Sequence, residues 1–414
     1  MKADAIVLKI ASRCNLNCSY CYMYNGGDLS YKSQPKFINK KHIDKLIERI
    51  KEHCLTHSLS EFSIILHGGE PLLADISLYQ YLIEKANELK YYNIKIDFSV
   101  QTNGVLVNEE WIELFEKNRF GLGFSLDGTE ETHDKFRIYH NGKGSYQDVL
   151  AGMLIYKAKT NNLPVLTVVD VESDPIELYE HYKSIGITHW HTLMPDYTHE
   201  SKPEWITEGK TLIADWFIKL YNYWVEDKDK KKIKSIHTFQ LLSNLIFGTG
   251  VGNDHIGTTK NSVLVIETNG GIETTDPLKI CGEGFTKAGM DIFKNSFDEA
   301  LQTPLANVQY NAHHELCVQC SVCPIKNVCG GGYLAHRYKY DNGFDNPTVY
   351  CKDHIKLITY LQNDLFKRLP DYILAELDVD SMSENDVLNS IKIQLERIPK
   401  GLEINQKLSQ FALA

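Results

Sequence analysis

Short apolar runs alternate with longer amphipathic stretches along roughly the first 200 residues of the chain. Runs of about five β-branched or aromatic residues are typical of strands, whereas apolar positions spaced i, i+3, i+4 and i+7 are typical of helices. The alternation predicts six β/α units around a parallel sheet. The expected strands are Ile6–Ile10, Phe62–Leu66, Ile96–Val100, Leu122–Leu126, Val165–Val169 and His189–Met194, and the expected helices include Leu78–Leu89 and Glu110–Phe115.

Beyond residue 200 the pattern changes. Glu204–Glu226 is expected to form one long amphipathic helix, and an Asn-Gly turn at Asn269 predicts a hairpin between Val263–Glu267 and Ile272–Thr274. The fold class is therefore α/β: a partial (β/α)6 TIM barrel followed by a small Cys-rich domain. The expected parts are the barrel (1–200), a helical bridge (201–260), the Cys-rich domain (261–370) and a helical tail with a frayed end (371–414).

Composition narrows the choice of function. The net charge of −10 argues against a nucleic-acid-binding surface. No apolar run approaches the roughly 20 residues that span a membrane, and the N-terminus lacks the pattern of a signal peptide. A cytoplasmic protein is expected. Its ten cysteines then indicate metal ligation rather than disulfides.

Three cysteines follow the first expected strand. Cys14, Cys18 and Cys21 have the spacing C-x3-C-x2-C. Three thiolates on one loop can hold three irons of a cubane cluster and leave the fourth iron open for chemistry. Cys54 differs, because it continues the apolar face of a helix that begins after Asn39, a suitable N-cap. Cys54 is therefore expected to be a buried apolar residue.

Polar and glycine residues stand at the ends of the next strands. Gly68-Gly69-Glu70 follows the second strand, Gln101 and Asn103 end the third, and Ser125 ends the fourth. In β/α folds the carboxyl ends of the strands meet at one side, where ligands bind. The alternative for each residue is an ordinary polar residue at a strand end.

Together, these motifs resemble those of the radical S-adenosylmethionine (SAM) enzymes. In that family the open iron binds SAM, and an electron from the cluster cleaves SAM to a 5′-deoxyadenosyl radical that abstracts hydrogen. The resemblance implies that Gly68, Gly69 and Glu70 bind the amino group of SAM and that Tyr20 shields the cluster. It also implies SAM-side positions for Gln101, Asn103, Ser125 and Arg137.

A second group of cysteines lies near the C-terminus. Structural zinc is the rival explanation for C-x2-C pairs, but five close thiols with a sixth upstream suit an iron–sulfur cluster better. The segment resembles the SPASM-type auxiliary-cluster domain, although Tyr333 stands near the place of another cysteine. The resemblance implies at least one auxiliary [4Fe-4S] cluster. The expected ligands are Cys281, Cys317, Cys320, Cys323, Cys329 and Cys351.

Several longer segments narrow the resemblance to the FxsB-like branch of these enzymes. They include the opening Val7–Tyr24, the hairpin Val265–Glu273 and Phe344–Cys351. That branch modifies ribosomally made precursor peptides, and several members form a cyclophane by joining an aromatic ring to a side-chain carbon. The implied partners are a precursor peptide and an electron donor such as flavodoxin or ferredoxin. The alternatives are an anaerobic sulfatase-maturing enzyme that makes formylglycine, and a zinc-stabilised binding module without catalysis.

An oxidative crosslink also needs a base near the substrate. Asp276 follows the expected hairpin, and His189 and His191 alternate with Trp190 on the sixth strand. Alternation places both histidines on one face of the sheet. Asp276 and His191 are the candidate catalytic residues, and the alternative for each is a hydrogen-bonded structural role.

Overall fold

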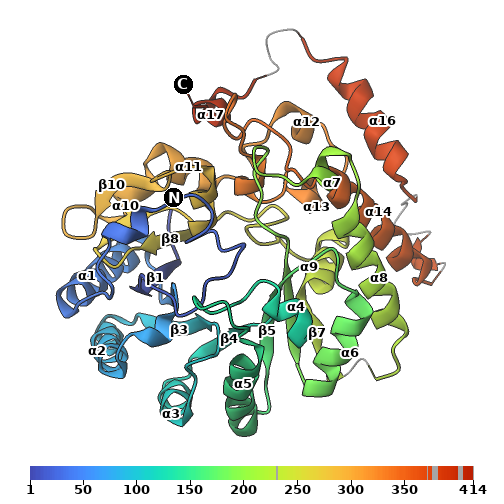
Figure 1. Ribbon diagram of the computed structural model, residues 1–414. Coiled ribbons are helices and arrows are strands. Elements are labelled where there is room, and N and C mark those ends of the chain that lie inside the picture. The colour runs from blue at the N-terminus through green and yellow to red at the C-terminus, as the bar shows by residue number, and fades with distance from the viewer. Residues whose placement is uncertain (230–231, 371, 375–380, 400–403, 414) are drawn as a thin grey trace. The chain divides into compact units, whose positions relative to one another are not determined.

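The computed structural model describes residues 1–229, 232–370, 372–374, 381–399 and 404–413 (Figure 1). Contacts divide the chain into two compact units. Unit 1 comprises Met1–Val168, His181–Leu193 and Ser262–Tyr310, and unit 2 comprises Val169–Glu180, Met194–Asn261 and Asn311–Ala414. Within the described residues, no helix is long and apolar enough to cross a membrane.

The sheet of unit 1 confirms the six expected strands. Neighbouring strands from β1 to β6 pair in parallel and in chain order, as β/α units require. Their side chains alternate between a buried outer face and a more polar inner face, as on β2. The bounds are β1 Ala5–Ala11, β2 Glu61–Gly68, β3 Lys95–Thr102, β4 Gly121–Ser125, β5 Pro164–Val168 and β6 His189–Leu193.

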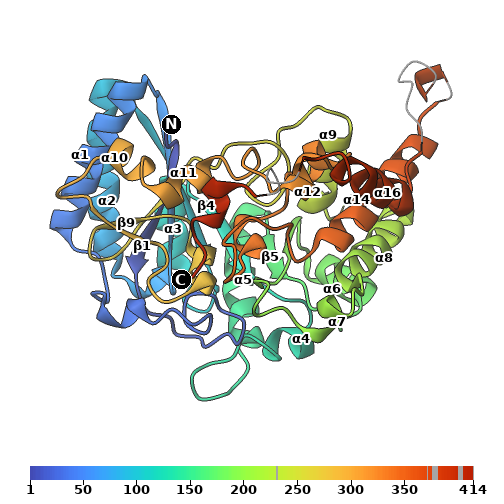
Figure 2. The ribbon, with the colours of Figure 1, turned by 90° about the horizontal axis from the view of Figure 1, so that it is seen from above.

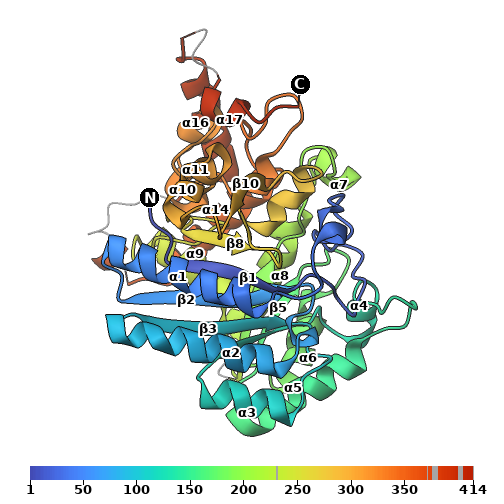
Figure 3. The same cartoon turned by 90° about the vertical axis from the view of Figure 1, so that its left-hand side faces the viewer.

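Amphipathic helices lie alongside these strands, as Figure 3 shows for α1, α2 and α3. The Asn39 side chain accepts a hydrogen bond from the His42 amide and begins α1, as expected. Cys54 is fully buried in the apolar face of α1, which confirms its packing role. The bounds are α1 Lys40–His57, α2 Ile76–Asn87, α3 Glu109–Lys117, α4 Glu130–Asp134, α5 Tyr146–Thr160, α6 Pro175–Ile185, α10 Phe297–Leu301 and α11 Pro304–Tyr310.

The expected hairpin forms between β8 (Val263–Ile266) and β9 (Gly271–Glu273). Its first strand also pairs in parallel with β1, and β10 (Lys287–Asp291) pairs with β9. Residues 262–310 therefore belong to unit 1, although the sequence grouped them with the Cys-rich segment at 261–370. The physical reason is that β8 satisfies the backbone groups along the free edge of β1.

Unit 2 is largely helical. The single helix expected over Glu204–Glu226 is wrong, because the structure has α7 (Glu204–Thr207) and α8 (Leu212–Glu226). Gly209 lies between them with φ +76°, a left-handed conformation that ends helices. Figure 2 shows α8 near α14 (Cys351–Lys367), and the Tyr221 hydroxyl donates to Asp364 at 2.8 Å between them.

The remaining elements of unit 2 are short. In the tail, Ser383 caps α16 with a capping box, so a helix is present there as expected. The expected fraying falls partly on residues outside the described ones. The other bounds are β7 Ser235–Ile236, α9 His237–Ile246, α12 Val318–Ser321, α13 Lys326–Cys329, α16 Glu384–Leu395 and α17 Gln406–Ser409.

Candidate active site and auxiliary cysteine cluster

The loop after β1 carries Cys14, Cys18 and Cys21, all of them free thiols. Hydrogen bonds within the loop hold its shape: the Cys21 amide donates to the Cys18 carbonyl at 3.0 Å. Burial raises the pKa of all three thiols, that of Cys18 to about 11. Thiolates in such a loop need an external positive charge, which bound iron supplies. The donor set therefore fits an open iron–sulfur cluster.

Arg137 and Tyr20 meet beside this loop through Asp127. Arg137 Nε donates to Asp127 Oδ2 at 2.8 Å, and the Tyr20 hydroxyl donates to the same carboxylate. The guanidinium lies 5.5 Å from the centre of the Tyr20 ring and 4.0 Å from Cys18 Sγ. Asp127 thus fixes two predicted residues against the cluster loop. Asp127 was not among the predicted site residues, although its position just after a strand was a usable signal.

The two glycines after β2 allow the cluster loop to pack closely. A Cβ on Gly68 would lie 2.0 Å from the Ala11 carbonyl oxygen, and one on Gly69 would lie 2.2 Å from that of Arg13. The Gly69 amide instead donates to Ala11 at 3.0 Å, and the Glu70 amide to Arg13 at 2.9 Å. The two glycines therefore allow close contact between the cluster loop and the segment after β2. This contact is additional to the close approach of a ligand that the sequence predicts.

Glu70 is buried and held by three hydrogen bonds. Its oxygens accept from Thr102 Oγ1 at 2.7 Å and from the amides of Asn103 and Leu72 at 2.8 and 2.9 Å. Burial raises the pKa of the Glu70 carboxyl to about 7, although these bonds act to lower it. Its Oε2 accepts only one of the three bonds, so it keeps a lone pair for the ammonium group that the resemblance implies.

Three further residues that the resemblance places beside SAM lie close to the same loop or to each other. Gln101 Nε2 donates to Ser125 Oγ at 2.9 Å across β3 and β4. Asn103 Nδ2 donates to Asn15 Oδ1 at 2.7 Å and lies 3.8 Å from Cys14 Sγ. The structure therefore brings the residues that the resemblance singled out to one end of the sheet, next to the three cysteines.

His191 lies on the inner face of the sheet. It pairs with Leu166, which pairs with Ser125, and paired residues of parallel strands share a face. His189 is two residues away and shares that face, whereas Trp190 is fully buried on the other. His189 and His191 therefore share one face of the sheet, as their alternation with Trp190 predicts.

Asp276 is buried against Lys9 of β1. Lys9 Nζ lies 2.5 Å from Asp276 Oδ2 and 3.5 Å from His67 Nδ1, and Lys9 and His67 pair in register on the inner face. Burial opposes ionisation of Asp276, but Lys9 and Lys279 outweigh it and hold the pKa below the usual value. Asp276 Oδ1 is buried and has no hydrogen-bond partner among the described residues.

The residues around Asp276 form a charged network that the sequence analysis missed. Lys279 Nζ contacts Glu267 at 2.9 Å and Glu273 at 2.8 Å. Burial, together with the positive charge of Lys9, lowers the pKa of His67 to about 4, so this ring is neutral at pH 7. Lys9, which lies within the apolar run of β1, could have indicated this network in the sequence, because a buried charge needs a partner of opposite charge.

In unit 2, four cysteines line one small pocket: Cys320, Cys323, Cys329 and Cys351. Cys317 does not line this cavity, but it lies near Cys320 and is hydrogen-bonded to it. Cys281 belongs to unit 1 and is not among the lining residues either. Four thiols around one cavity fit a fully ligated [4Fe-4S] cluster.

Arg337 supplies a positive charge beside these thiols. Its guanidinium donates to the carbonyls of residues 330–332 at 2.7 to 2.9 Å and to that of Ala312 at 2.7 Å. It is 1% exposed, and no ion pair joins it to a carboxylate of the described residues. An unpaired buried cation is costly. The anionic sulfurs of a bound cluster would provide the missing counter-charge.

Two polar side chains lie against the sulfurs of these cysteines. His354 Nδ1 lies 3.2 Å from Cys329 Sγ, and Gln319 Nε2 lies 3.8 Å from Cys351 Sγ. Burial lowers the pKa of His354 to about 3, so the ring is neutral and can donate one N–H. Hydrogen bonds to sulfur of this kind tune the potential of iron–sulfur clusters. Tyr333, near the place of another cysteine, stacks on His255 at 4.3 Å instead.

Comparison with known proteins supports this class of chemistry. Residues 8–185 match the model of the radical SAM superfamily. A cysteine-type anaerobic sulfatase-maturating enzyme of Clostridium novyi is 26% identical over 388 residues, which cover 89% of this chain and 100% of that protein.

Two solved structures show the same fold. Native anSMEcpe with bound AdoMet has a TM-score of 0.74 at 21% identity, covering 88% of this chain and 98% of that chain. Streptococcus suis SuiB bound to the precursor peptide SuiA has a TM-score of 0.52 at 16% identity, covering 81% and 72%.

The chain therefore has a radical SAM domain and is an enzyme, a radical SAM oxidoreductase related to the anaerobic sulfatase-maturating enzymes. The expected α/β fold and the enzyme class are confirmed. So are the cofactors of such a domain, a [4Fe-4S] cluster and SAM, together with an auxiliary cluster for which the unit 2 cysteines provide ligands. The assignment of individual ligands and of the catalytic base stays a prediction.

Proposed function

We propose that this enzyme removes two electrons and two protons from a side chain of a peptide or protein substrate. The observation that carries the proposal is Asp276, an ionised carboxylate held by Lys9 on the inner face of the barrel sheet. Its free oxygen, Oδ1, is buried and without a hydrogen-bond partner among the described residues. Such an atom is suited to take a proton from a substrate carbon or nitrogen.

The bound cofactors supply hydrogen-atom abstraction and an acceptor for the second electron. The residues of the chain do the rest. Asp276 Oδ1 takes the remaining proton while Lys9 keeps Oδ2 fixed. Arg137, Asp127 and Tyr20 hold the cluster loop, and Gln101, Asn103 and Ser125 lie where they would contact SAM. One hydrogen atom, one electron and one proton leave the substrate, so the oxidation balances.

The first product to test is a crosslink between an aromatic ring and a neighbouring side-chain carbon. The FxsB-like segments support this crosslink. In addition, SuiB, whose fold this chain shares, has been solved with a precursor peptide bound. The substrate would then be a ribosomal precursor peptide, and the reductant a flavodoxin or ferredoxin. His191, on the same face as Ser125, is the second candidate base.

A second product is formylglycine. The sulfatase-maturating relative from Clostridium novyi matches along its whole length, which favours this reaction over other radical SAM chemistry. The same base and electron acceptor serve both reactions, because each begins with oxidation of a side-chain carbon. The two products differ in what captures the oxidised carbon: a neighbouring aromatic ring, or water.

The discriminating experiment uses the anaerobically reconstituted enzyme with SAM and a reductant. One arm contains a peptide encoded beside the gene, and the other contains sulfatase peptides with Cys or Ser at the target position. A peptide lighter by two hydrogens, with the new bond at an aromatic residue, supports crosslinking, whereas an aldehyde trapped by a hydrazine supports formylglycine. Transfer of a methyl group or sulfur, or modification of tRNA, would contradict the proposal while leaving the SAM chemistry intact.

A further inference from the structure

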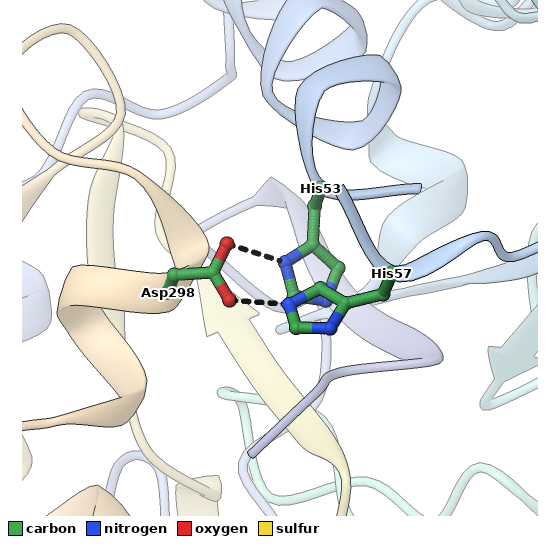
Figure 4. A group of neighbouring side chains, drawn as sticks. All are labelled: His53, His57 and Asp298. Atoms are coloured by element: carbon green, nitrogen blue, oxygen red, sulfur yellow. Dashed lines mark hydrogen bonds and ion pairs between the residues drawn. The ribbon is translucent and has the colours of Figure 1, made fainter. Parts of the chain in front are cut away.

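A separate group of ligand-type side chains lies on the outside of the barrel sheet. His53 and His57 stand one turn apart on α1, and Asp298 stands on α10 (Figure 4). Figure 4 shows the carboxylate of Asp298 facing both imidazole rings. His53 Nδ1 lies 3.3 Å from Asp298 Oδ2, and His57 Nε2 lies 2.6 Å from Oδ1. The three donor atoms lie within 4.8 Å of one another.

This arrangement has the features of a metal site. Histidines at i and i+4 share one face of a helix, which is how two imidazoles bind one Zn²⁺. His53 is buried, and its other nitrogen, Nε2, lies 3.0 Å from both the amide nitrogen and the carbonyl oxygen of Ala3. With Nδ1 bound to a metal, Nε2 would carry the proton and donate to this carbonyl. A metal-bound histidine commonly donates its second N–H to a backbone carbonyl, which fixes the ring with the other nitrogen toward the metal.

We propose that His53 Nδ1, His57 Nε2 and the Asp298 carboxylate form a Zn²⁺ site. This inference does not depend on the proposed function, because none of the three residues belongs to the active site. His57 and Asp298 side chains are 25% and 36% exposed, so a water can complete the coordination and the ion can enter. Zn²⁺ binds His₂-carboxylate sets of this kind.

The two His–Asp pairs are close to the separation that a bound ion requires. Tetrahedral ligands about 2.0–2.2 Å from Zn²⁺ are roughly 3.3–3.5 Å apart. The His53–Asp298 pair already has this separation, at 3.3 Å. The His57–Asp298 pair, at 2.6 Å, must open by under about 1 Å, which the exposed His57 ring can accommodate by a shift toward solvent. The metal-free state is a hydrogen-bonded His–Asp–His group.

A bound ion would join three separate segments of unit 1. His53 and His57 belong to α1, Asp298 lies in the first turn of α10, and His53 also contacts Ala3 before β1. A ligand that binds the folded state alone stabilises it in proportion to its concentration over its dissociation constant. The role of the site is therefore to fasten α10 to α1, and a structural ion serves this purpose without redox chemistry.

The first test measures Zn²⁺ binding to the reconstituted enzyme, whose cluster-binding cysteines are occupied by iron–sulfur clusters. Equilibrium dialysis should give one Zn²⁺ per chain for the native enzyme and for the control His314→Ala, which changes an exposed histidine elsewhere. His57→Ala and Asp298→Asn should each lose that ion. Absence of binding by the native enzyme, or unchanged binding by both variants, would overturn the proposal.

A third variant separates a metal site from a simple ion pair. Asp298→His removes the carboxylate that an ion pair requires but restores a metal donor, so it should regain the Zn²⁺ that Asp298→Asn loses. Amide exchange followed by mass spectrometry gives the location: Zn²⁺ should slow exchange at least several-fold in the last turn of α1 and in α10. Failure of Asp298→His to bind, or protection confined to the cysteine segments, would contradict the site.

Discussion

The two cysteine regions of this enzyme both offer thiol ligands, but they differ in the number of thiols that lie together. The loop after β1 presents three thiols in unit 1, whereas four thiols line one cavity in unit 2. Each region has a buried arginine, but Arg137 is paired with Asp127, and Arg337 is held by backbone carbonyls. Three ligands leave an iron free for SAM, whereas four leave none. Because of this difference in the number of ligands, we propose bond-making chemistry for the unit 1 loop and electron transfer for the unit 2 pocket.

The largest effect is expected from changing Cys14, Cys18 and Cys21 together to Ala. Without three ligands the SAM-side cluster cannot be held, so reductive formation of 5′-deoxyadenosine should fall to background. Iron and sulfide equivalent to one [4Fe-4S] cluster should remain in unit 2. Quantifying 5′-deoxyadenosine, iron and sulfide in the anaerobic protein checks both statements, and undiminished cleavage of SAM would contradict the assignment of the loop.

Single Ala substitutions among the C-terminal cysteines should sort them into two groups. Changing Cys320, Cys323, Cys329 or Cys351 should remove most of the auxiliary iron, because these residues line the cavity. Cys317→Ala and Cys281→Ala serve as matched controls and should retain more iron than the four. One zinc per chain with no sulfide in the native protein would show that the site is a zinc centre.

Asp276→Asn should separate the two stages of the reaction. SAM cleavage should continue, because the cluster loop is untouched, while product formation falls roughly 10²–10⁴-fold, as expected for loss of a general base. Equal loss of 5′-deoxyadenosine and product would indicate a structural role. Asp276 is fixed by Lys9, so Lys9→Met provides a second variant with the carboxylate still present.

The pH dependence of product formation distinguishes Lys9→Met from the native enzyme. Lys9 and Lys279 hold the pKa of Asp276 below its usual value against the opposing effect of burial, so the carboxylate is ionised at neutral pH. In the native enzyme no loss of rate from Asp276 is expected near neutral pH. Lys9→Met removes one positive charge and raises the pKa of Asp276. As the pH is lowered, the rate of this variant should therefore begin to fall at a higher pH than the rate of the native enzyme.

The smallest effect is expected for Arg337→Lys, which keeps the charge but cannot reach all the carbonyls that the guanidinium binds. Arg337→Gln removes the charge as well. A positive charge favours the more negative, reduced cluster, so Arg337→Gln should lower the potential of the auxiliary cluster, and Arg337→Lys should lower it less. Redox titration followed by electron paramagnetic resonance measures both. Equal potentials in all three proteins would show that Arg337 acts on the loop of residues 330–332 alone.

The sequence by itself determined the local elements and the ligand types. The strands β1 to β6, the Asn39 cap, the hairpin around Asn269 and the spacing of the first three cysteines all depend on neighbouring residues, and each is found in the structure. A helix over Glu204–Glu226 failed because one left-handed glycine, Gly209, outweighed the apolar pattern.

Only the tertiary structure decided which distant groups meet. The pairing of β8 with β1, the burial of Lys9 against Asp276, the four cysteines around one cavity and the meeting of His53 with Asp298 each join segments far apart in the chain. The physical reason is that periodicity and spacing report on contacts within a helix, strand or turn. Pairing of an edge strand and neutralisation of a buried charge depend on which partners the folded chain brings within a few ångströms.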